Sequence, residues 1–251
     1  MNKEYIKKAL RHNIPKIDIY DSLESTNTLM KEEAKKGAKE FSVIIASMQS
    51  NGRGRMGRSF FSPCGSGLYM SILLRPKKDI NPLYITPFAA VAVSNAFERI
   101  SGKSAQIKWV NDIYVDNRKV CGILTEASLG ENGYSVLGIG VNVFMPDGGF
   151  PDDIKMRAGA LFEKEEEYIR EKVATLIINE FIDIYKAFDK EKMLSEYTKR
   201  SLVLGKEIDI IENGKTETAT AISVDDEFSL IVKKEDGMLY TLNSGDVSIK
   251  I

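Results

Sequence analysis

The feature that most restricts the fold of this chain is a glycine–arginine segment that lies between two strand-like runs. Residues 52–58 read Gly-Arg-Gly-Arg-Met-Gly-Arg and follow the apolar run 41–48, which has the composition of a buried strand. The three glycines match the G-x-G-x-x-G spacing of dinucleotide-binding units. Such a unit needs a helix that begins at the third glycine, whereas here a polar stretch leads to another strand-like run, 68–74. The segment therefore predicts a loop between strands. A kinase-like glycine loop is excluded as well, because no HRD or DFG segment follows.

The arginines of this segment indicate a negatively charged ligand. Three guanidinium groups within seven positions repel one another unless an anion lies among them, and glycine lets the backbone approach such a ligand closely. The whole chain is nearly neutral, with 35 Lys and Arg against 36 Asp and Glu, so it has no general attraction for nucleic acid or membranes. We therefore rank a lid that closes over phosphate or carboxylate above a nucleic-acid contact, and a purely structural turn last.

Length and composition indicate an ordinary globular protein. The chain has 251 residues, of which 43% are hydrophobic, enough for one large domain or a large and a small one. No apolar run approaches the roughly 20 residues of a membrane span, and the opening residues lack the apolar centre of a signal peptide, so a cytoplasmic location is expected. Cys64 and Cys121 have no metal-ligand spacing and are predicted to be buried free thiols. His12 is the only histidine and is predicted to lie at the surface, which argues against His-based nucleophilic catalysis.

The order of predicted elements indicates an α+β protein with two parts. Helices are predicted after Ser25, which can cap a helix that ends at Gly37, over 87–101 before Gly102, and over the amphipathic stretch 166–188. Between the last two helices, residues 106–144 predict a meander of strands with a turn at 116–118. After about residue 200, five short alternating segments are separated by turn residues, which predicts a small five-stranded barrel.

A second cluster of functional residues is Lys108-Trp109-Val110-Asn111-Asp112. If residues 106–115 form one strand, Lys108 and Val110 lie on one face, and Trp109 and Asn111 on the other. A lysine within an apolar strand is costly unless it has a partner. Taken alone, Lys108 would be interpreted as an edge lysine that reaches solvent or pairs with Asp112.

Taken together, these motifs resemble the biotin protein ligases. The features that carry the resemblance occur in the same order and at comparable spacing: Ser25-Thr26-Asn27, Gln49, the 52–58 loop, Lys108 to Asp112, Cys121 to Leu124 and Gly138 to Val143. The resemblance implies a class II synthetase-like catalytic domain with a mixed sheet and flanking helices over residues 1–200, followed by an SH3-like β-barrel over residues 201–251. It also implies an enzyme that activates biotin with ATP to biotinyl-5'-adenylate and pyrophosphate. The biotinyl group then passes to one lysine of a biotin carboxyl carrier domain.

The resemblance also implies roles for individual residues. Lys108 matches a lysine that contacts both the biotin carboxyl end and the phosphate, and with Arg55 it is the catalytic candidate. The residues predicted to bind biotin are Ser25, Thr26, Asn27, Gln49, Gly52, Arg53, Gly54, Arg55, Lys108 and Gly122. The residues predicted to bind the adenylate are Arg53, Arg55, Arg58, Phe60, Lys108, Asn111 and Asn142. No metal ligand is nominated, because Mg²⁺ is expected to arrive with ATP, held by phosphates and water.

The sequence departs from the family pattern at a few positions. Met56 and Phe60 stand where many relatives have arginine and tryptophan, Val110 replaces the usual proline, and Lys250 stands where an arginine is common. Only about 24 residues precede Ser25, too few for the helix-turn-helix domain of some ligases. A monofunctional ligase without DNA binding is therefore expected. Dimerisation is common among the relatives, but the sequence identifies no interface for it.

Two alternative functions remain. A lipoate or octanoate ligase or transferase shares the catalytic fold and reaction logic with the biotin ligases, but the chain lacks the RRxxGGGxVxHD signature of that group. The other alternative is a non-catalytic module that binds a nucleotide. The expected protein partner is the carrier domain of a biotin-dependent carboxylase or decarboxylase.

Overall fold

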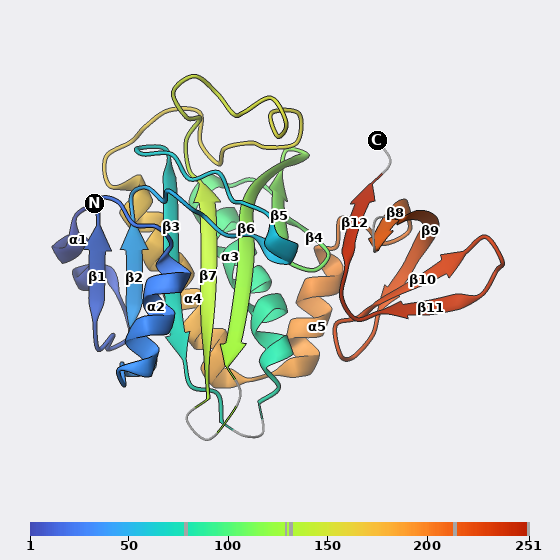
Figure 1. The fold of residues 1–251 in the computed structure, drawn as a ribbon, viewed down its shortest axis with the longest axis horizontal. Coiled ribbons are helices and arrows are strands. Elements are labelled where there is room, and N and C mark those ends of the chain that lie inside the picture. Colours follow the sequence, from blue (N-terminus) through green and yellow to red (C-terminus); the bar gives the residue numbers. More distant parts are fainter. Residues whose placement is uncertain (78–79, 129, 131–132, 213–214, 250–251) are drawn as a thin grey trace.

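A seven-stranded mixed sheet forms the larger part of the molecule (Figure 1). The computed structural model describes residues 1–77, 80–128, 130, 133–212 and 215–249. The strands follow the order β1-β2-β3-β7-β6-β5-β4, in which β1 and β2 are parallel and all other neighbours are antiparallel. Their bounds are β1 (Ile17–Tyr20), β2 (Val43–Ala46), β3 (Gly67–Leu74), β4 (Gln106–Lys108), β5 (Asp112–Val115), β6 (Arg118–Ser128) and β7 (Tyr134–Asn142).

Helices cover both faces of this sheet. Helix α2 (Thr26–Lys35) packs on one face against β3 and β7, whereas α3 (Ile85–Ser101) and α4 (Ile169–Ala187) cover the other (Figure 1). The alternation of β3 explains this division, because Met70 and Ile72 join the core below α3 and α4 while Leu73 packs with Met30 of α2. The remaining helices are α1 (Lys3–Ala9), α5 (Lys190–Lys199) and the short 3₁₀ turns η1 (Arg55–Gly57) and η2 (Pro82–Tyr84).

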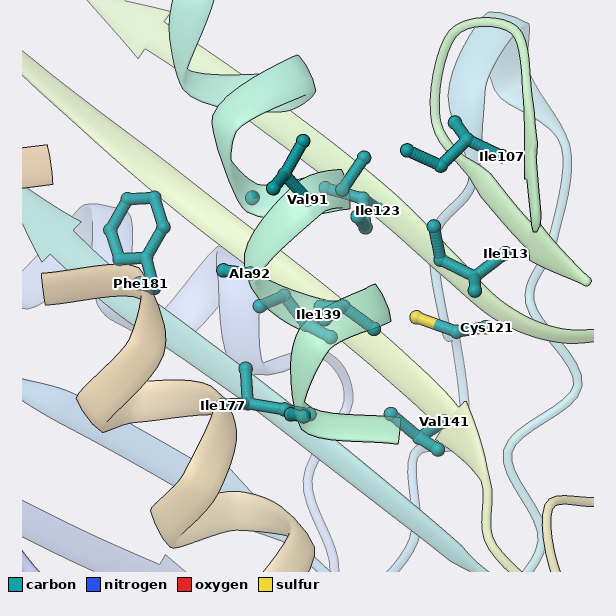
Figure 2. Close-up of a cluster of buried hydrophobic side chains, with 14 of the residues drawn as sticks. Val91, Ala92, Ile107, Ile113, Cys121, Ile123, Ile139, Val141, Ile177 and Phe181 are labelled. Atoms are coloured by element: carbon teal, nitrogen blue, oxygen red, sulfur yellow. The ribbon is translucent and has the colours of Figure 1, made fainter. Parts of the chain in front are cut away.

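The main core lies between the sheet and helices α3 and α4. Figure 2 shows Val91 and Ala92 of α3 and Phe181 of α4 beside side chains of the strands, among them Ile139 and the thiol of Cys121. Cys121 is fully buried, as predicted, and burial raises the pKa of its thiol well above the ordinary value. For Cys64 the prediction was wrong, because this residue is exposed.

Local signals fix the start of α2 and the end of α3. The hydroxyl of Ser25 accepts a hydrogen bond from the amide of Thr28 at 3.5 Å, so Ser25 caps α2 as predicted. Gly102 adopts φ +69° and terminates α3.

His12 is less exposed than predicted, because its Nε2 atom lies 2.8 Å from Asp183 Oδ1 of α4.

The segment 106–115 is not the single strand predicted from its alternation. It folds into a hairpin in which β4 and β5 pair and residues 109–111 form the turn, with Lys108 opposite Asp112. The assignment of faces to residues 108–111 was therefore wrong. The next turn, between β5 and β6, lies where predicted, and Asp116 and Asn117 both adopt positive φ there, at 50° and 60°.

The C-terminal residues form a second, separate sheet. Its five antiparallel strands follow the order β11-β10-β9-β8-β12, which confirms the predicted small all-β unit. The bounds are β8 (Glu207–Glu212), β9 (Lys215–Val224), β10 (Leu230–Lys234), β11 (Leu239–Leu242) and β12 (Asp246–Ile249). The predicted domain boundary at residue 200/201 lies between the end of α5 and the start of β8, and it stays a prediction. Within the described residues, no helix combines the length and apolar character needed to cross a membrane.

The second sheet lies next to α5 and the β4 edge of the first sheet (Figure 1). Ser201 forms a parallel bridge with Ile107 of β4. The buried indole of Trp109 donates a hydrogen bond to the carbonyl of Phe228, which lies in the β9–β10 turn, at 2.9 Å. The hairpin turn at 109–111 is therefore held directly by the second sheet.

Candidate active site

A row of glycines leaves one face of the large sheet hollow. In the strand register Gly140 lies between Gly122 and Tyr69, and Gly138 lies between Leu124 and Ser71. A Cβ atom at Gly140 would lie 2.6 Å from the ring of Phe60, and one at Gly138 would lie 2.3 Å from Asn27 Oδ1. Both positions therefore need glycine, and they form the floor of a pocket on the α2 side of the sheet, with a cavity volume of about 100 Å³.

Most of the residues predicted to bind biotin or the adenylate line this pocket. They come from the start of α2, the segment that follows β2, the 52–60 loop, the 109–111 turn and strand β6. They are Ser25, Thr26, Asn27, Gln49, Arg53, Gly54, Arg55, Arg58, Phe60, Asn111 and Gly122. Met56 also lines the pocket, and Gly245, between β11 and β12, brings the second sheet to its rim.

Hydrogen-bonded polar groups form the wall at the α2 end. Gln49 Oε1 accepts from the amide of Thr26 at 2.8 Å and from its hydroxyl at 3.1 Å, while Gln49 Nε2 donates to Ser62 Oγ at 3.1 Å. Ser71 Oγ of β3 lies 2.8 Å from Thr26 Oγ1 and 2.6 Å from Asn27 Oδ1. Because these groups orient one another, the wall presents fixed donors and acceptors to the pocket.

The glycine–arginine segment folds back over the pocket as a short hairpin. Phe60 N donates to Gly52 O at 2.8 Å, Gly54 N donates to Arg58 O at 2.7 Å, and η1 forms the tip. An extended chain then leads to β3, so no helix begins at Gly57 and the dinucleotide-binding alternative does not apply. At the tip, Met56 adopts φ +54° and leaves 66% of its surface exposed.

The loop is attached to the 109–111 turn through Asn111. Arg55 Nη1 donates to Asn111 Oδ1 at 3.2 Å, and Asn111 Nδ2 donates to the carbonyl of Ile123 at 2.8 Å. Phe60, at the other end of the loop, places its ring over Gly122 and Gly140 and meets the ring of Tyr69 edge-on at a centroid distance of 6.3 Å. The loop thus brings three arginines and an aromatic ring to the pocket that the polar wall borders.

Comparisons with known proteins agree with this geometry. The model of the Biotin/lipoate A/B protein ligase family matches residues 19–142, which contain most of the pocket. The chain is 34% identical over 242 residues to the Bifunctional ligase/repressor BirA of Bacillus subtilis, and the match covers 92% of this chain and 73% of the relative. The chain belongs to the biotin protein ligases. A second relative, the Biotin--[acetyl-CoA-carboxylase] ligase of Mycobacterium tuberculosis, is 25% identical over 92% of this chain and 88% of its own length.

The solved structures of biotin protein ligases share both sheets of this chain. The biotin protein ligase from Aquifex aeolicus in complex with biotin and ATP superposes with a TM-score of 0.79 at 27% identity, over 94% of this chain and 99% of that one. The predicted fold class is therefore confirmed by topology and by superposition.

Lys119 is a pocket residue of this ligase that the sequence analysis did not identify. It lies on β6 and lines the pocket, and its Nζ atom is 2.7 Å from Asp112 Oδ1. The register shows why simple alternation misplaces it. Ile113 pairs with Cys121 but Tyr114 pairs with Lys119, so Val120 is an extra residue and both Val120 and Cys121 join the core. Without this bulge Lys119, three positions before Gly122, would lie on the opposite face.

Three of the predicted site residues are not among the described residues that line the pocket. Lys108 ends β4 directly across from Asp112, next to the pocket but outside its lining. Asn142 donates from Nδ2 to the carbonyl of Gly159 at 3.0 Å, so it anchors the connection that follows β7. Gly52 lies behind the wall, where a Cβ would be 2.3 Å from Phe60 O. Lys250 lies outside the described residues.

Glu126 is a carboxylate that pairs with an arginine of the loop. It accepts from Lys31 Nζ at 2.9 Å and from Asn27 Nδ2 at 2.9 Å, and Arg53 Nη2 lies 3.4 Å away. Burial raises the pKa of Glu126, but the hydrogen bonds from Lys31 and Asn27 and the nearby positive charges outweigh it, so the pKa is below its ordinary value. Over the described ranges, no three His, Cys, Asp or Glu side chains are grouped as metal ligands.

Proposed function

We propose that the pocket catalyses both half-reactions of a biotin protein ligase. A carboxylate oxygen of biotin attacks the α-phosphorus of ATP and pyrophosphate leaves, which gives biotinyl-5'-adenylate. The amine of a carrier lysine then attacks the acyl carbon, AMP leaves, and the new amide nitrogen loses a proton. The observation that carries this proposal is a single pocket that joins a neutral polar wall to a rim of lysine and arginine side chains.

The polar wall suits the ureido ring of biotin. This ring is rigid and neutral, with one carbonyl acceptor and two N–H donors, and needs partners fixed in advance. Ser25, Thr26, Asn27 and Gln49 supply such groups at the closed end of the pocket. Because Gln49 is held by Thr26 on one side and Ser62 on the other, little order remains to be imposed when biotin binds.

Fixed positive charge is needed where carboxylate and phosphate meet. Two anions repel each other, so their approach requires a cation placed beforehand. We assign this role first to Lys119, because its ammonium lies in the pocket and is held by Asp112. Lys108 remains the candidate from the family resemblance, and its place beside Asp112 lets the two be compared directly.

The loop residues Arg53, Arg55 and Arg58 are proposed to close over the adenylate. Their positive charge favours a closed loop only when a ligand supplies negative charge, and closure excludes water that would hydrolyse the mixed anhydride. Phe60 offers a ring on which adenine can stack, and Asn111 anchors Arg55. Asn142 remains a proposed contact to adenine, although its amide holds Gly159 here.

The remaining assignments concern substrates and partners. Biotin and ATP are the small-molecule substrates, and Mg²⁺ is expected to enter with the nucleotide phosphates. The proposed acceptor is the biotin carboxyl carrier domain of a biotin-dependent carboxylase or decarboxylase.

ATP/pyrophosphate exchange tests the proposed function. Exchange should depend on biotin and stay at background with lipoate or without an acid. Exchange that depends on lipoate would favour a lipoate ligase, and nucleotide binding without exchange would favour a binding module. Transfer is tested with a carrier domain and with the same domain lacking its acceptor lysine, of which only the first should be labelled.

A further inference from the structure

Glu126 connects three separate parts of the site. It lies on β6, and its carboxylate contacts Asn27 and Lys31 of α2 and Arg53 of the loop. Its side chain is 21% exposed, so these charges are screened less than those of a surface pair. Because its partners belong to helix α2 and to the loop, the carboxylate of Glu126 connects the loop to the body of the protein.

The two cations are not equivalent partners of Glu126. Lys31 Nζ lies 2.9 Å from Oε1 and its side chain is 27% exposed, whereas Arg53 Nη2 lies 3.4 Å away and its side chain is 45% exposed. One ammonium at 2.9 Å already balances the single negative charge. Arg53 is therefore the weaker and more accessible partner, and it can leave without exposing an uncompensated carboxylate.

We propose that Glu126 is a positioning residue that holds Arg53 at the rim of the ligand-free pocket and releases it to the negatively charged ligand. This inference rests on the proposed function, in which Arg53 belongs to the closing loop. The exchange of partners leaves the Asn27 amide in place, because Glu126 keeps Lys31 and Asn27 when Arg53 departs. Glu126 thus separates a part of the site that stays fixed from a part that moves.

The variant Glu126→Gln tests this proposal selectively. Glutamine can still accept the hydrogen bond from Asn27 Nδ2, but it removes the charge that attracts Arg53. Limited trypsin cleavage after Arg53, Arg55 and Arg58, mapped by mass spectrometry, reports how often the loop opens. We expect cleavage of the ligand-free variant to be roughly two- to fivefold faster than that of the unaltered protein, the range for a partly exposed pair. With biotin and ATP present, cleavage should be equally slow in both.

Glu24→Gln is the matched control. Glu24 accepts from Asn51 Nδ2 at 3.2 Å, so it contacts the base of the same loop but none of its arginines. Its cleavage rates should equal those of the unaltered protein with and without ligand. If the contact of Glu126 were merely structural, Glu126→Gln would accelerate cleavage both with and without ligand, because the loop would lack this partner even when ligand is bound.

A double-mutant cycle on the affinity for biotinyl-5'-adenylate gives a second readout. The proposed role predicts that Glu126→Gln binds the adenylate more tightly, whereas a merely structural role predicts weaker binding. Release of Arg53 from Glu126 opposes binding, so Glu126→Gln should tighten the Kd for biotinyl-5'-adenylate, measured by calorimetry, by roughly two- to fivefold. In an Arg53→Gln background this gain should largely disappear, which separates the exchange of partners from the general effect of removing a negative charge.

The outcomes separate the two proposals. Equal trypsin cleavage of the ligand-free Glu126→Gln and unaltered proteins would overturn the role of Glu126, as would weaker adenylate binding by the variant. Loss of ligand protection in the unaltered protein would instead contradict the proposed function. The ligand-free comparison needs no ligand and so tests the contact between Glu126 and Arg53 in either case.

Discussion

At the scale of single residues, the two lysines near Asp112 have different surroundings and should behave differently. Lys119 lines the pocket and lies 2.7 Å from Asp112, whereas Lys108 lies outside the lining. We predict that Lys119→Ala lowers kcat for biotin-dependent exchange by about 10²–10³, the usual loss when one charge-stabilising group is removed. Lys108→Ala should have a smaller effect. An equal loss in both variants would restore Lys108 to the role expected from the family resemblance.

Removal of Lys119 also leaves Asp112 with one partner fewer, which needs its own control. In Lys119→Ala/Asp112→Asn the carboxylate charge is absent as well. If the loss in the single variant comes from an uncompensated Asp112, the double variant recovers exchange. If Lys119 acts on the substrates, exchange stays low in both.

The loop arginine Arg55 should control retention of the intermediate. Its guanidinium donates to Asn111 at 3.2 Å, so it ties the loop tip to the turn beside the pocket. Arg55→Gly removes this tie and one positive charge, and we predict faster release of biotinyl-adenylate, with labelling of bystander proteins. Retention is measured by rapid gel filtration after single-turnover adenylation.

Met56→Arg is the variant expected to act in the opposite direction. Met56 is exposed at the loop tip and already adopts a left-handed conformation, so arginine meets the same backbone requirement. The added charge should slow release of the adenylate. Unchanged release in both variants would remove the loop arginines from product control.

At the scale of elements, the β4–β5 turn is held from behind by helix α5. The buried hydroxyl of Tyr197 donates to Val110 O at 3.1 Å, and the same turn carries Asn111 into the pocket. Tyr197→Phe removes only this hydroxyl. We predict a loss of about 1 kcal/mol in the free energy of unfolding, together with a severalfold lower exchange rate, because the turn is no longer fixed.

Tyr185→Phe provides a matched control for that prediction. Tyr185 is a buried tyrosine of α4 whose hydroxyl donates to Glu40 at 3.4 Å, and it does not line the pocket. Urea unfolding and exchange are measured for both variants. Tyr185→Phe should change stability without changing exchange, and a parallel loss of exchange in both would contradict a specific role for the turn.

The elements that local signals define were the ones that sequence could predict. Ser25 and Gly102 bound helices through backbone chemistry that depends on a few neighbouring residues, and the Asp116-Asn117 turn needs residues that tolerate positive φ. The 109–111 turn contains no glycine or proline and lies in a β-rich run, so Asn111 and the following Asp112 give only a weak turn signal.

The missed parts of the site depend on pairing between strands and on distant contacts. The bulge at Val120 brings Lys119 to the pocket face, and only the register with β5 shows it. The contact between Arg53 and Glu126 joins a loop to a strand far along the chain. Polar groups of the wall that are consecutive or belong to a known motif, such as Ser25 to Asn27, can be predicted from the sequence.

At the scale of the whole molecule, the two sheets share buried contacts and should unfold together. Phe228 of the second sheet packs against Tyr84, Phe88 and Tyr197 of the larger part, with ring centroids 5.7 to 6.0 Å apart. Trp109 adds a buried hydrogen bond to the same residue. The pocket therefore depends on both sheets, since the turn that carries Asn111 is packed between them.

An ion cluster at the junction of the two sheets links this packing to pH. Arg200 donates to Glu98 of α3 at 2.9 Å and to Glu196 of α5 at 2.6 Å, and its carbonyl accepts from Ile107 of β4 at 2.7 Å. Hydrogen bonds from Arg200 and Lys199 lower the pKa of Glu196 from 4.5 to about 2. The carboxylate is thus stabilised in the folded protein relative to the unfolded chain.

The sign of this shift gives a specific pH prediction. A lowered folded-state pKa contributes stability that is complete above pH 4.5 and is lost as the pH falls through about 2. Since 28% of the Glu196 side chain is exposed, solvent screens the pair, and we expect Glu196→Gln to cost about 1 kcal/mol near neutral pH. That difference from the unaltered protein should stay constant down to about pH 5 and shrink at lower pH, because protonation removes the same charge.

Urea unfolding at several pH values measures this difference, with Glu235→Gln as the control. Glu235 is exposed near the β10–β11 turn, away from Arg200, so its substitution should change stability little at any pH. A Glu196→Gln difference that persists unchanged well below pH 4.5 would show that glutamine disrupts packing at the junction rather than removing a charge. A difference that grows on acidification would contradict the pairing with Arg200, because the charge that Arg200 stabilises is then already lost in both proteins.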